Sequence, residues 1–502
     1  MGMNSSIFFL TFIFGFIIFS THSSYSKPLI FPLTHTLSTS HFTTTHHLLK
    51  STTTHSTTRF HHHHNRRVSV ALAPGTDYTM SFSLGSSPKQ TVTVYMDTGS
   101  DTVWLPCQPF TCIMCEGKYD PKTTPLPHNL STSASPVSCQ SRACSFTHSG
   151  ATTSDLCASA RCPLESIEMS ECEKHSCPPF YYAYGDGSFV ARLYKDSFEI
   201  PMSAPPALVV KNFTFGCAHE ALGEPIGVAG FGRGALSLPA QLAQFSPHLG
   251  SQFSYCLVSH SFDTDRVRQP SPLILGRADS VGSGVDQNKE KRVDSADPEP
   301  DDFAYTNMLD NPKHPYYYYV GLDAVTVGNY WITAPENMKK IDRKGNGGMV
   351  VDSGTTYTML PEKFYNMIVK EFGKRLKPGL KRAGSVEDRT GLSPCYYLDQ
   401  QPKGVVVMVP QLVLHFGGNN SSVVMPRRNY FYEFMDGGDD DGVKRKVGCM
   451  MLMNGGYFPD SGGPAGLLGN YQQQGLEVVY DLWKKRVGFA RRKCASLWDR
   501  VG

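Results

Sequence analysis

Two short stretches of this chain combine a carboxylate, a small hydroxyl residue and a glycine. They are Asp97-Thr98-Gly99-Ser100 and, far downstream, Asp352-Ser353-Gly354-Thr355. Each follows an apolar run, which predicts that each carboxylate stands at the end of a buried strand. One such tripeptide alone is typical of an ordinary turn or helix cap. Two copies in similar surroundings instead indicate two carboxylates that act together.

A pair of carboxylates is suited to the hydrolysis of a peptide bond. The attacking water must lose a proton to a base while an acid polarises the carbonyl group. Two carboxyl groups held close together do not both ionise easily, so the pair keeps one proton and supplies both functions. That proton belongs to the pair rather than to Asp97 or to Asp352. We expect these two residues to be catalytic. The glycine of each turn would admit a backbone N–H close to the carboxylate, and the hydroxyl residues Thr98 and Ser353 would hydrogen-bond across the turns.

The elements around the two turns are predicted to be β-strands in two related units. Tyr78–Gly85 and Gln90–Met96 alternate apolar and polar residues, as half-buried strands do. A segment of small and apolar residues follows each turn, Gly227–Gly232 after the first and Ala465–Asn470 after the second. The 45 glycines and 34 prolines favour turn-rich β structure over helical bundles. The sequence therefore predicts an all-β-dominated fold with a few short helices, built from two duplicated lobes.

Changes in composition divide the 502 residues into five expected segments. They are a signal peptide (1–26), a low-complexity propeptide-like leader (27–67), an N-terminal catalytic lobe (68–262) with a Cys-rich insertion (107–177), an exposed inter-lobe loop region (263–302) and a C-terminal catalytic lobe (303–502). The leader is rich in Ser, Thr and His, has little that could form a core, and ends at Arg66-Arg67. We expect it to be disordered and removed on maturation.

Several features predict export of the chain. The apolar run Ile7–Phe19 is too short to span a bilayer and is typical of a signal peptide. Fourteen cysteines, nine of them between Cys107 and Cys177, favour disulfide bonds in an oxidising compartment. Candidate glycosylation sites are Asn129, Asn212, Asn419 and Asn420. The expected location is the secretory pathway and then the apoplast or cell wall, with the vacuole as an alternative, and no stable membrane anchor is expected.

Metal and nucleic-acid binding have weaker support. Cys112 and Cys115 alone would suit zinc or a redox dithiol, but the export signal and the neighbouring cysteines favour disulfides. The run His61–His64 would suit a metal, but it lies in the low-complexity leader. The net charge is only +3 and the basic runs 484–486 and 491–493 are short, so surface residues explain them. No metal site and no nucleic-acid partner are expected.

The chain resembles a known family over nearly all of the region from Tyr78 to Ala490. The residues that carry the resemblance are the two Asp turns, Tyr184-Gly185-Asp186-Gly187-Ser188, Gly469-Asn470-Tyr471-Gln472-Gln473-Gln474 and Val487-Gly488-Phe489-Ala490. They resemble the pepsin-like aspartic proteases, specifically the plant branch that includes nepenthesin and nucellin. The resemblance implies a bilobal β fold with an active cleft between the lobes, and a monomer that cleaves proteins or peptides without a metal or organic cofactor.

The resemblance also implies roles for individual residues. Asp97 and Asp352 would bind and activate water, and Ser100 and Thr355 would hydrogen-bond to the outer carboxylate oxygens. Tyr184, Gly185, Asp186 and Gly187 would form a flap that closes over the substrate, with Trp104 supporting Tyr184. Cys395 and Cys449 would form a second-lobe disulfide, and Cys256 with Cys494 is a further pairing hypothesis.

Two alternatives stay open at this point. The same fold also serves as a secreted inhibitor of cell-wall xylanases, so the chain could be a catalytically silent protein-binding module. Intact Asp turns and Tyr184 favour the enzyme. A relative described as a chloroplast nucleoid protein suggests nucleic-acid binding, which the signal peptide, the cysteines and the modest charge disfavour.

Overall fold

The computed structural model describes fourteen ranges of the chain. They are residues 29–35, 49–50, 52–53, 78–115, 129–184, 187–200, 207–223, 226–259, 270–276, 303–376, 379–400, 407–437, 444–456 and 463–497. The predicted signal peptide, His61–His64, Arg66-Arg67 and the flap residues Gly185 and Asp186 lie outside them.

β-strands dominate the described residues, as the sequence predicted. The first half contains β1 Leu29–His35, β2 Tyr78–Leu84, β3 Gln90–Asp97, β4 Val103–Ile113, β5 Ser135–Pro136, α2 Arg142–Thr147, α3 Thr153–Ser159, α4 Leu164–Glu168, β6 Phe180–Ala183, β7 Ser188–Ile200, β8 Leu208–Leu222, β9 Val228–Gly230, α5 Leu238–Phe245, α6 Pro247–Ser251, β10 Gln252–Cys256 and β11 Ser271–Leu275. The second half contains β12 Ala304–Leu309, β13 Tyr319–Val320, β14 Leu322–Val327, β15 Tyr330–Thr333, α7 Glu336–Lys339, β16 Met349–Val351, β17 Met359–Leu360, α8 Glu362–Arg375, α9 Gly384–Thr390, β18 Cys395–Tyr397, β19 Leu412–Phe416, β20 Ser422–Val424, α10 Arg427–Tyr430, β21 Phe431–Asp436, β22 Arg445–Met450, β23 Met453–Asn454, β24 Gly466–Leu468, α11 Asn470–Gln473, β25 Leu476–Asp481, β26 Arg486–Arg491 and a 3₁₀ turn at Cys494–Ser496.

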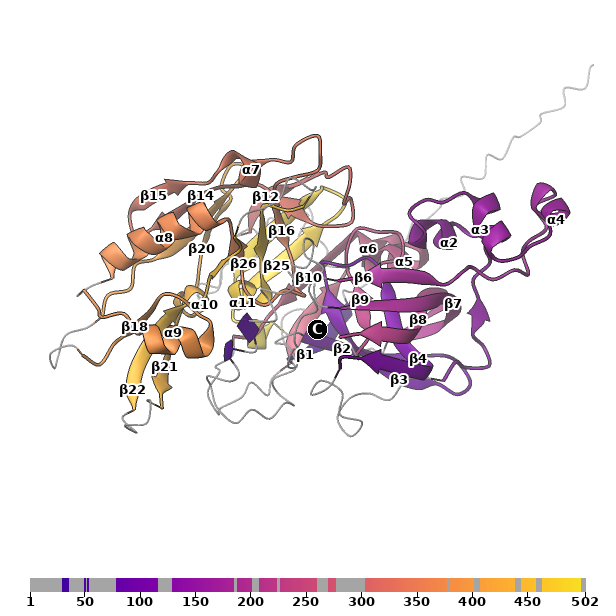
Figure 1. Cartoon of the computed structure of the whole chain (residues 1–502), viewed down its shortest axis with the longest axis horizontal. Coiled ribbons are helices and arrows are strands. Elements are labelled where there is room, and N and C mark those ends of the chain that lie inside the picture. The colour runs from indigo at the N-terminus through magenta and orange to yellow at the C-terminus, as the bar shows by residue number, and fades with distance from the viewer. Residues whose placement is uncertain are drawn as a thin grey trace, which may run out of the picture.

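The two halves form two lobes that lie side by side and share one sheet (Figure 1). Its strand order is β1-β11-β10-β25-β26-β12, and every neighbouring pair is antiparallel. Within this sheet the halves meet where β10 pairs with β25, in register from Gln252 opposite Asp481 to Cys256 opposite Glu477. Strands from both halves thus complete one hydrogen-bonded ladder, which fixes the lobes relative to each other.

The duplication seen in the sequence is also a duplication of strand pairing. β3, which ends at Asp97, pairs in parallel with β9. β16, which precedes Asp352, pairs in parallel with β24 in the same way. In both lobes the Asp strand therefore pairs with the later segment of small and apolar residues.

Alternating side chains build the cores of the lobes. In β2 the residues Tyr78, Met80, Phe82 and Leu84 are buried, whereas Ser81 between them is exposed. In the second lobe α8 buries Phe364, Ile368 and Phe372, spaced by four residues, against β14 and β15. These are the periods of two and near four that strands and helices require.

Three predicted boundaries need correction. Residues 27–67 were expected to have little that could form a core, yet Leu29–His35 is a strand with alternating buried side chains. The inter-lobe region 263–302 was expected to be an exposed loop, but Ser271–Leu275 is a fully buried strand. The Cys-rich insertion was placed at 107–177, but 107–113 belong to β4. In the first two cases a short apolar stretch is stabilised by distant strands that local sequence does not reveal. Residues 107–113 instead continue a strand that begins at Val103 and pairs with β8.

The rest of the Cys-rich insertion is a small helical unit stapled by disulfides. α2, α3 and α4 stand out from the first lobe at the end far from the second lobe (Figure 1). Three bridges hold them, Cys139–Cys157, Cys144–Cys177 and Cys162–Cys172. Large apolar side chains here stay exposed, Leu164 at 71% and Met169 at 62%. Because the unit buries few apolar groups, covalent links supply much of its stability.

All fourteen cysteines lie in described ranges and all are paired. The remaining bridges are Cys107–Cys217, Cys112–Cys115, Cys256–Cys494 and Cys395–Cys449. The last two are the pairs named in the sequence analysis. A search of the described residues found no helix with the length and apolar character needed to cross a membrane.

Candidate active site

The two predicted catalytic carboxylates occupy equivalent positions in the two lobes. Asp97 is the last residue of β3 and Asp352 follows β16 directly. Their side chains are enclosed, with exposed fractions of 2% and 7%. The backbone of each is tied to the neighbouring small-residue segment, since Phe231 N–H donates to the Asp97 carbonyl and Asp352 N–H donates to the Leu468 carbonyl. The parallel strand pairs therefore place both carboxylates at their carboxyl ends.

Backbone and hydroxyl groups within each turn hold the carboxylates. Gly99 N–H donates to Asp97 Oδ1 at 2.8 Å, and Gly354 N–H donates to Asp352 Oδ1 at 2.9 Å. Thr355 Oγ1 donates to the other oxygen of Asp352, Oδ2, at 2.6 Å. Each carboxylate thus accepts a backbone hydrogen bond that fixes its orientation in the turn.

Ser100 does not make the hydrogen bond that the resemblance implied. Its hydroxyl is buried and has no hydrogen-bond partner among the described residues. Its carbonyl accepts from Gly232 N–H at 2.7 Å, so the backbone is held toward the segment after β9. The two turns therefore differ at this position, since the equivalent Thr355 hydroxyl donates to Asp352.

The two turns are interlocked. Thr98 N–H donates to Ser353 Oγ at 3.0 Å, and Ser353 N–H donates to Thr98 Oγ1 at 2.9 Å. Each hydroxyl also donates to the strand of the opposite lobe, Thr98 to the Val351 carbonyl and Ser353 to the Met96 carbonyl. Four buried hydrogen bonds therefore join the turns directly.

The interlock brings the two carboxylates to one place. A methyl group on Gly99 would lie 2.7 Å from Asp352 Oδ1, so that oxygen packs directly against the backbone of the first turn. The same glycine donates its N–H to Asp97. Both carboxylates therefore contact Gly99, and a side chain at this position would collide with Asp352.

The segment that begins at α11 supports the second turn from behind. Asn470 Nδ2 donates to the Ser353 carbonyl at 2.9 Å, and Gln473 Nε2 donates to the Asp352 carbonyl at 3.3 Å. Gln473 Oε1 in turn accepts from the Tyr255 hydroxyl. Burial and the adjacent Tyr480 raise the pKa of Tyr255 well above its ordinary value, so this phenol stays neutral. The motif Gly469–Gln474 carried part of the family resemblance, but these contacts were not predicted from the sequence.

The predicted flap is a hairpin of β6 and β7. Tyr184 N–H donates to the Gly187 carbonyl at 2.7 Å across the hairpin end, and Gly185 and Asp186 lie outside the described residues. Trp104 Nε1 donates to the Tyr184 hydroxyl. The Trp104 ring is fully buried and stacks on Phe189 of β7, with ring centroids 4.3 Å apart. The first Asp turn and the hairpin are thus joined through Trp104.

A second link between the hairpin and the turn was not predicted. Tyr182, two residues before Tyr184 and so on the same side of the strand, donates its hydroxyl to Asp101 Oδ1 at 3.2 Å. Burial raises the pKa of Asp101, although the Tyr182 hydrogen bond acts in the opposite direction. The only sign of this contact in the sequence is that an acidic residue, Asp101, stands four positions after Asp97. The motif of the first Asp turn does not include it.

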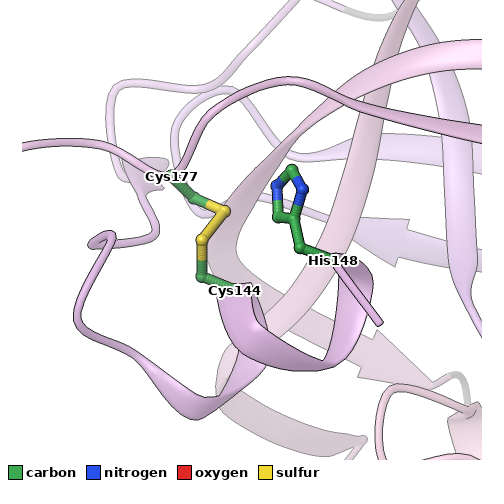
Figure 2. Close-up of side chains that lie close together, drawn as sticks. All are labelled: Cys144, His148 and Cys177. Atoms are coloured by element: carbon green, nitrogen blue, oxygen red, sulfur yellow. A yellow bond between two sulfur atoms is a disulfide. The ribbon is translucent and has the colours of Figure 1, made fainter. Parts of the chain in front are cut away.

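One group of side chains has the composition of a metal site but not its chemistry. Cys144, His148 and Cys177 lie together in the Cys-rich unit. Figure 2 shows that the two sulfurs are bonded to each other, with the imidazole beside them. His148 Nε2 lies 3.3 Å from the Pro178 carbonyl. Because a disulfide offers no thiolate, this group is a structural bridge next to a histidine.

The candidate glycosylation residues lie at the surface. Asn129, Asn212, Asn419 and Asn420 are all exposed. Asn212 and Asn420 have positive φ angles of 58° and 56°, which asparagine tolerates better than most residues. Their exposure makes modification of these side chains sterically feasible.

Comparison with known proteins agrees with the geometry. Residues 78–277 match the family described as Xylanase inhibitor N-terminal, and 317–491 match Xylanase inhibitor C-terminal. A probable aspartyl protease of Arabidopsis thaliana is 56% identical over 513 residues, covering 99% of each chain. The chain belongs to the plant pepsin-like aspartic protease family. Aspartic proteinase nepenthesin-2 of Nepenthes gracilis is 30% identical over 427 residues, 84% of this chain and 78% of that protein.

Solved structures share the aspartic protease fold with this chain. The crystal structure of edgp has a TM-score of 0.60 at 17% identity and covers 94% of this chain and 96% of its own. Basic 7S globulin from soybean has a TM-score of 0.59 at 18% identity, covering 94% and 99%. At this identity the likeness concerns the fold alone. The fold is therefore shared with proteins that are not named as proteases.

Proposed function

We propose that this protein is a secreted aspartic endopeptidase that cleaves proteins or peptides at acidic pH. The observation that carries the proposal is that two carboxylates, one from each lobe, both contact Gly99. A family member that had lost catalysis would be under no constraint to keep both. Protein substrates are also consistent with the names of the similar proteases.

In the proposed reaction Asp97 and Asp352 hold a water molecule and one shared proton. The ionised member of the pair removes a proton from the water as it attacks the peptide carbonyl, and the protonated member polarises the carbonyl oxygen. The bond from the carbonyl carbon to the amide nitrogen then breaks, and the leaving nitrogen takes a proton from the pair. Low pH favours this cycle because the shared proton is retained more readily there.

The surrounding hydrogen bonds assist the reaction because they restrict the movement of the two carboxylates and of the hairpin. The interlock of Thr98 and Ser353 holds the carboxylates in one geometry, which avoids reorganisation when charge develops. Tyr184, held by Trp104, stands at the end of the hairpin expected to cover the substrate and exclude water. No residue in this scheme requires a metal or an organic cofactor.

Export is proposed on separate grounds. The apolar run at residues 7–19 has the length of a signal peptide, and seven disulfides with no free cysteine suit an oxidising compartment. The proposed destination is the apoplast or cell wall, with the vacuole as the alternative, and the proposed state is a monomer. Fractionation of a plant that expresses the tagged protein would distinguish the two destinations.

The decisive experiment measures cleavage of an unfolded protein, such as denatured haemoglobin, from about pH 3 to about pH 8. The wild type is compared with Asp97→Asn and Asp352→Asn, with and without pepstatin, and with Asp388→Asn as a matched control at an exposed position. We expect acid-range cleavage that both active-site variants lose and the control keeps. Full activity in either active-site variant would refute the mechanism.

The second candidate function is a catalytically silent, protein-binding inhibitor of secreted glycosidases. The observation in its favour is that both lobes match families described as xylanase inhibitors. If the folded wild type cleaves nothing across the pH range, this candidate replaces the first. It is then tested by binding to secreted xylanases and by loss of their activity.

A further inference from the structure

The N-terminal segment of the described chain is built into the shared sheet. β1 pairs with β11 over five residue pairs, from Leu29 opposite Leu275 to Leu33 opposite Ser271. Its last two residues then pair with β2, Thr34 with Thr79 and His35 with Tyr78. One short strand therefore connects the shared sheet with the first-lobe sheet that carries Asp97.

The side chains of β1 contribute to the core. Phe31 and Leu33 are 2% and 0% exposed and belong to the main apolar cluster, whereas Pro32 and Thr34 between and after them are exposed. This alternation is that of a strand with one face in a core. Without β1 the backbone edge of β11 and the apolar groups under Phe31 and Leu33 would face water.

Leu49, Thr52 and Thr53 make a further contact, with the second lobe. Leu49 is fully buried in a cluster that includes Tyr357 and Val386. Thr52 Oγ1 lies 2.9 Å from the Tyr357 hydroxyl, and both groups are buried. Thr53 Oγ1 donates to the Thr390 carbonyl at 3.0 Å.

The position of Tyr357 makes this contact notable. It lies five residues after Asp352, on the segment that continues from the second catalytic turn into β17. The space beside Gly391 is also filled, because a methyl group there would lie 2.6 Å from Thr53 Oγ1. The surface formed by Tyr357, Thr390 and Gly391 is thus in close contact with Thr52 and Thr53.

No covalent bond other than the main chain ties these residues to the rest of the protein. The chain has no cysteine before Cys107, so no disulfide reaches them. The sequence between this segment and β2 contains Arg66-Arg67, the expected processing site. A cut there would separate residues 29–53 from both lobes in covalent terms.

We propose that residues 29–53 are a retained part of the mature protein and not a leader that is lost. After cleavage between 54 and 77 these residues remain bound to the lobes without a covalent link. β1 stays paired with β11, and Leu49, Thr52 and Thr53 stay in contact with Tyr357 and Thr390. The protein is then a two-chain complex whose small chain contacts both lobes. This inference is independent of the proposed catalytic activity.

The experiment uses the full chain with the recognition sequence of a site-specific protease in place of His61–His64. After cleavage, size-exclusion chromatography in native buffer is followed by denaturing electrophoresis and mass spectrometry of the eluted protein. We expect the N-terminal fragment to elute with the lobes and to separate from them only in denaturant. A fragment that elutes alone overturns the proposal, whether or not the lobes stay folded.

Variants then test the two contacts. The release rate of the fragment is followed by exchange with a labelled peptide of residues 28–56. Leu33→Ala and Leu49→Ala each remove a buried side chain and are expected to raise the release rate at least about tenfold. Thr34→Ala, at the neighbouring exposed position of β1, is the matched control and should release its fragment at the wild-type rate. Equal rates in all three variants would contradict the proposed binding surface.

Retention of the N-terminal segment can also be tested in the wild-type protein. The wild type secreted from plant cells is purified under native conditions and its N-termini are sequenced. Detection of a chain that starts before Leu29, together with one that starts between 54 and 77 or with an uncut chain, agrees with retention. A single chain that starts after residue 53 overturns it.

Discussion

Thr98 and Ser353 exchange hydrogen bonds in both directions, each accepting the backbone N–H of the other on its side-chain oxygen. The two residues are separated by 255 positions and come from different lobes. These two hydrogen bonds join the turns into one site. Because the turns are bonded to each other, the carboxylates beside them are held in one relative position.

Loss of one of these hydroxyls is expected to be costly. Thr98→Val keeps the shape of the side chain but leaves the Ser353 N–H and the Val351 carbonyl buried without partners. We expect a loss of about 2 to 4 kcal/mol in the free energy of unfolding, from two unsatisfied groups. Denaturant unfolding measures it. Thr98→Ser, which keeps the hydroxyl, is the control, and a loss below about 1 kcal/mol in Thr98→Val would contradict the role of the interlock.

Gly99 contacts both carboxylates, and a side chain there should prevent catalysis. In Gly99→Ala the methyl group would meet Asp352 Oδ1 at 2.7 Å, so the carboxylate must move. We expect kcat/KM for peptide cleavage to fall by about a hundredfold or more, since a shift of about 1 Å has that effect. Gly384→Ala, where nothing lies within 4 Å of the added methyl, is the control. Equal activity of the two variants would exclude close contact at Gly99.

Asp101 should make stability depend on pH in a direction opposite to that of most acidic residues. Burial raises its pKa, so the folded protein binds a proton there more tightly than the unfolded chain does. The favourable contribution is complete below the ordinary pKa of 3.8 and is lost as pH rises through the folded value. Asp101→Asn should therefore gain in Tm relative to the wild type between about pH 3 and about pH 7. A constant difference would disprove the shift.

Glu387 should show the reverse dependence. Burial opposes its charge, but hydrogen bonds from Arg382, from the Cys395 N–H and from Ser393 outweigh burial and lower its pKa. Its contribution is present above the ordinary pKa of 4.5 and is lost as pH falls through the folded value. Glu387→Gln should reduce Tm more at about pH 7 than at about pH 3. Exposed Glu165→Gln is the control, with no such trend expected.

The contact between Thr52 and Tyr357 can be measured by a double-mutant cycle. Thr52→Val and Tyr357→Phe each remove one hydroxyl of a buried hydrogen bond and should each cost about 1 to 3 kcal/mol of unfolding free energy. The double variant should cost less than the sum by about 1 kcal/mol, because the partner left unpaired by the first change is also removed. Additive costs would mean that the two hydroxyls are not coupled.

Repetition made much of this site predictable from the sequence. The two Asp turns and the small-residue segments are local patterns, and their order along the chain was enough to expect two equivalent strands. The hairpin that ends at Tyr184 was also visible, since a Gly-rich turn between strands is a local signal. Contacts between residues far apart were harder. Tyr182 with Asp101 joins two positions that no motif connects, and the Ser100 hydroxyl has no hydrogen-bond partner among the described residues although Thr355 at the equivalent position has one.

The strands that were missed show the same limit. Leu29–His35 and Ser271–Leu275 lie in polar surroundings and looked like parts of a leader and a loop. Each is stabilised by the other, through an antiparallel ladder that joins residues more than two hundred positions apart. A five- to seven-residue apolar stretch has no stability as a strand until a partner covers its edge and its buried face.

The sequence by itself therefore determined the family, the predominance of β structure and the identity of the two carboxylates, because these follow from residue types at fixed local spacing. Only the tertiary structure decided how the carboxylates meet at Gly99, which groups hold the hairpin, and that Leu29–His35 packs on the first lobe while Leu49, Thr52 and Thr53 contact the second. Those features depend on hydrogen bonds and burial between distant segments, and their free energy exists only when the chain is folded.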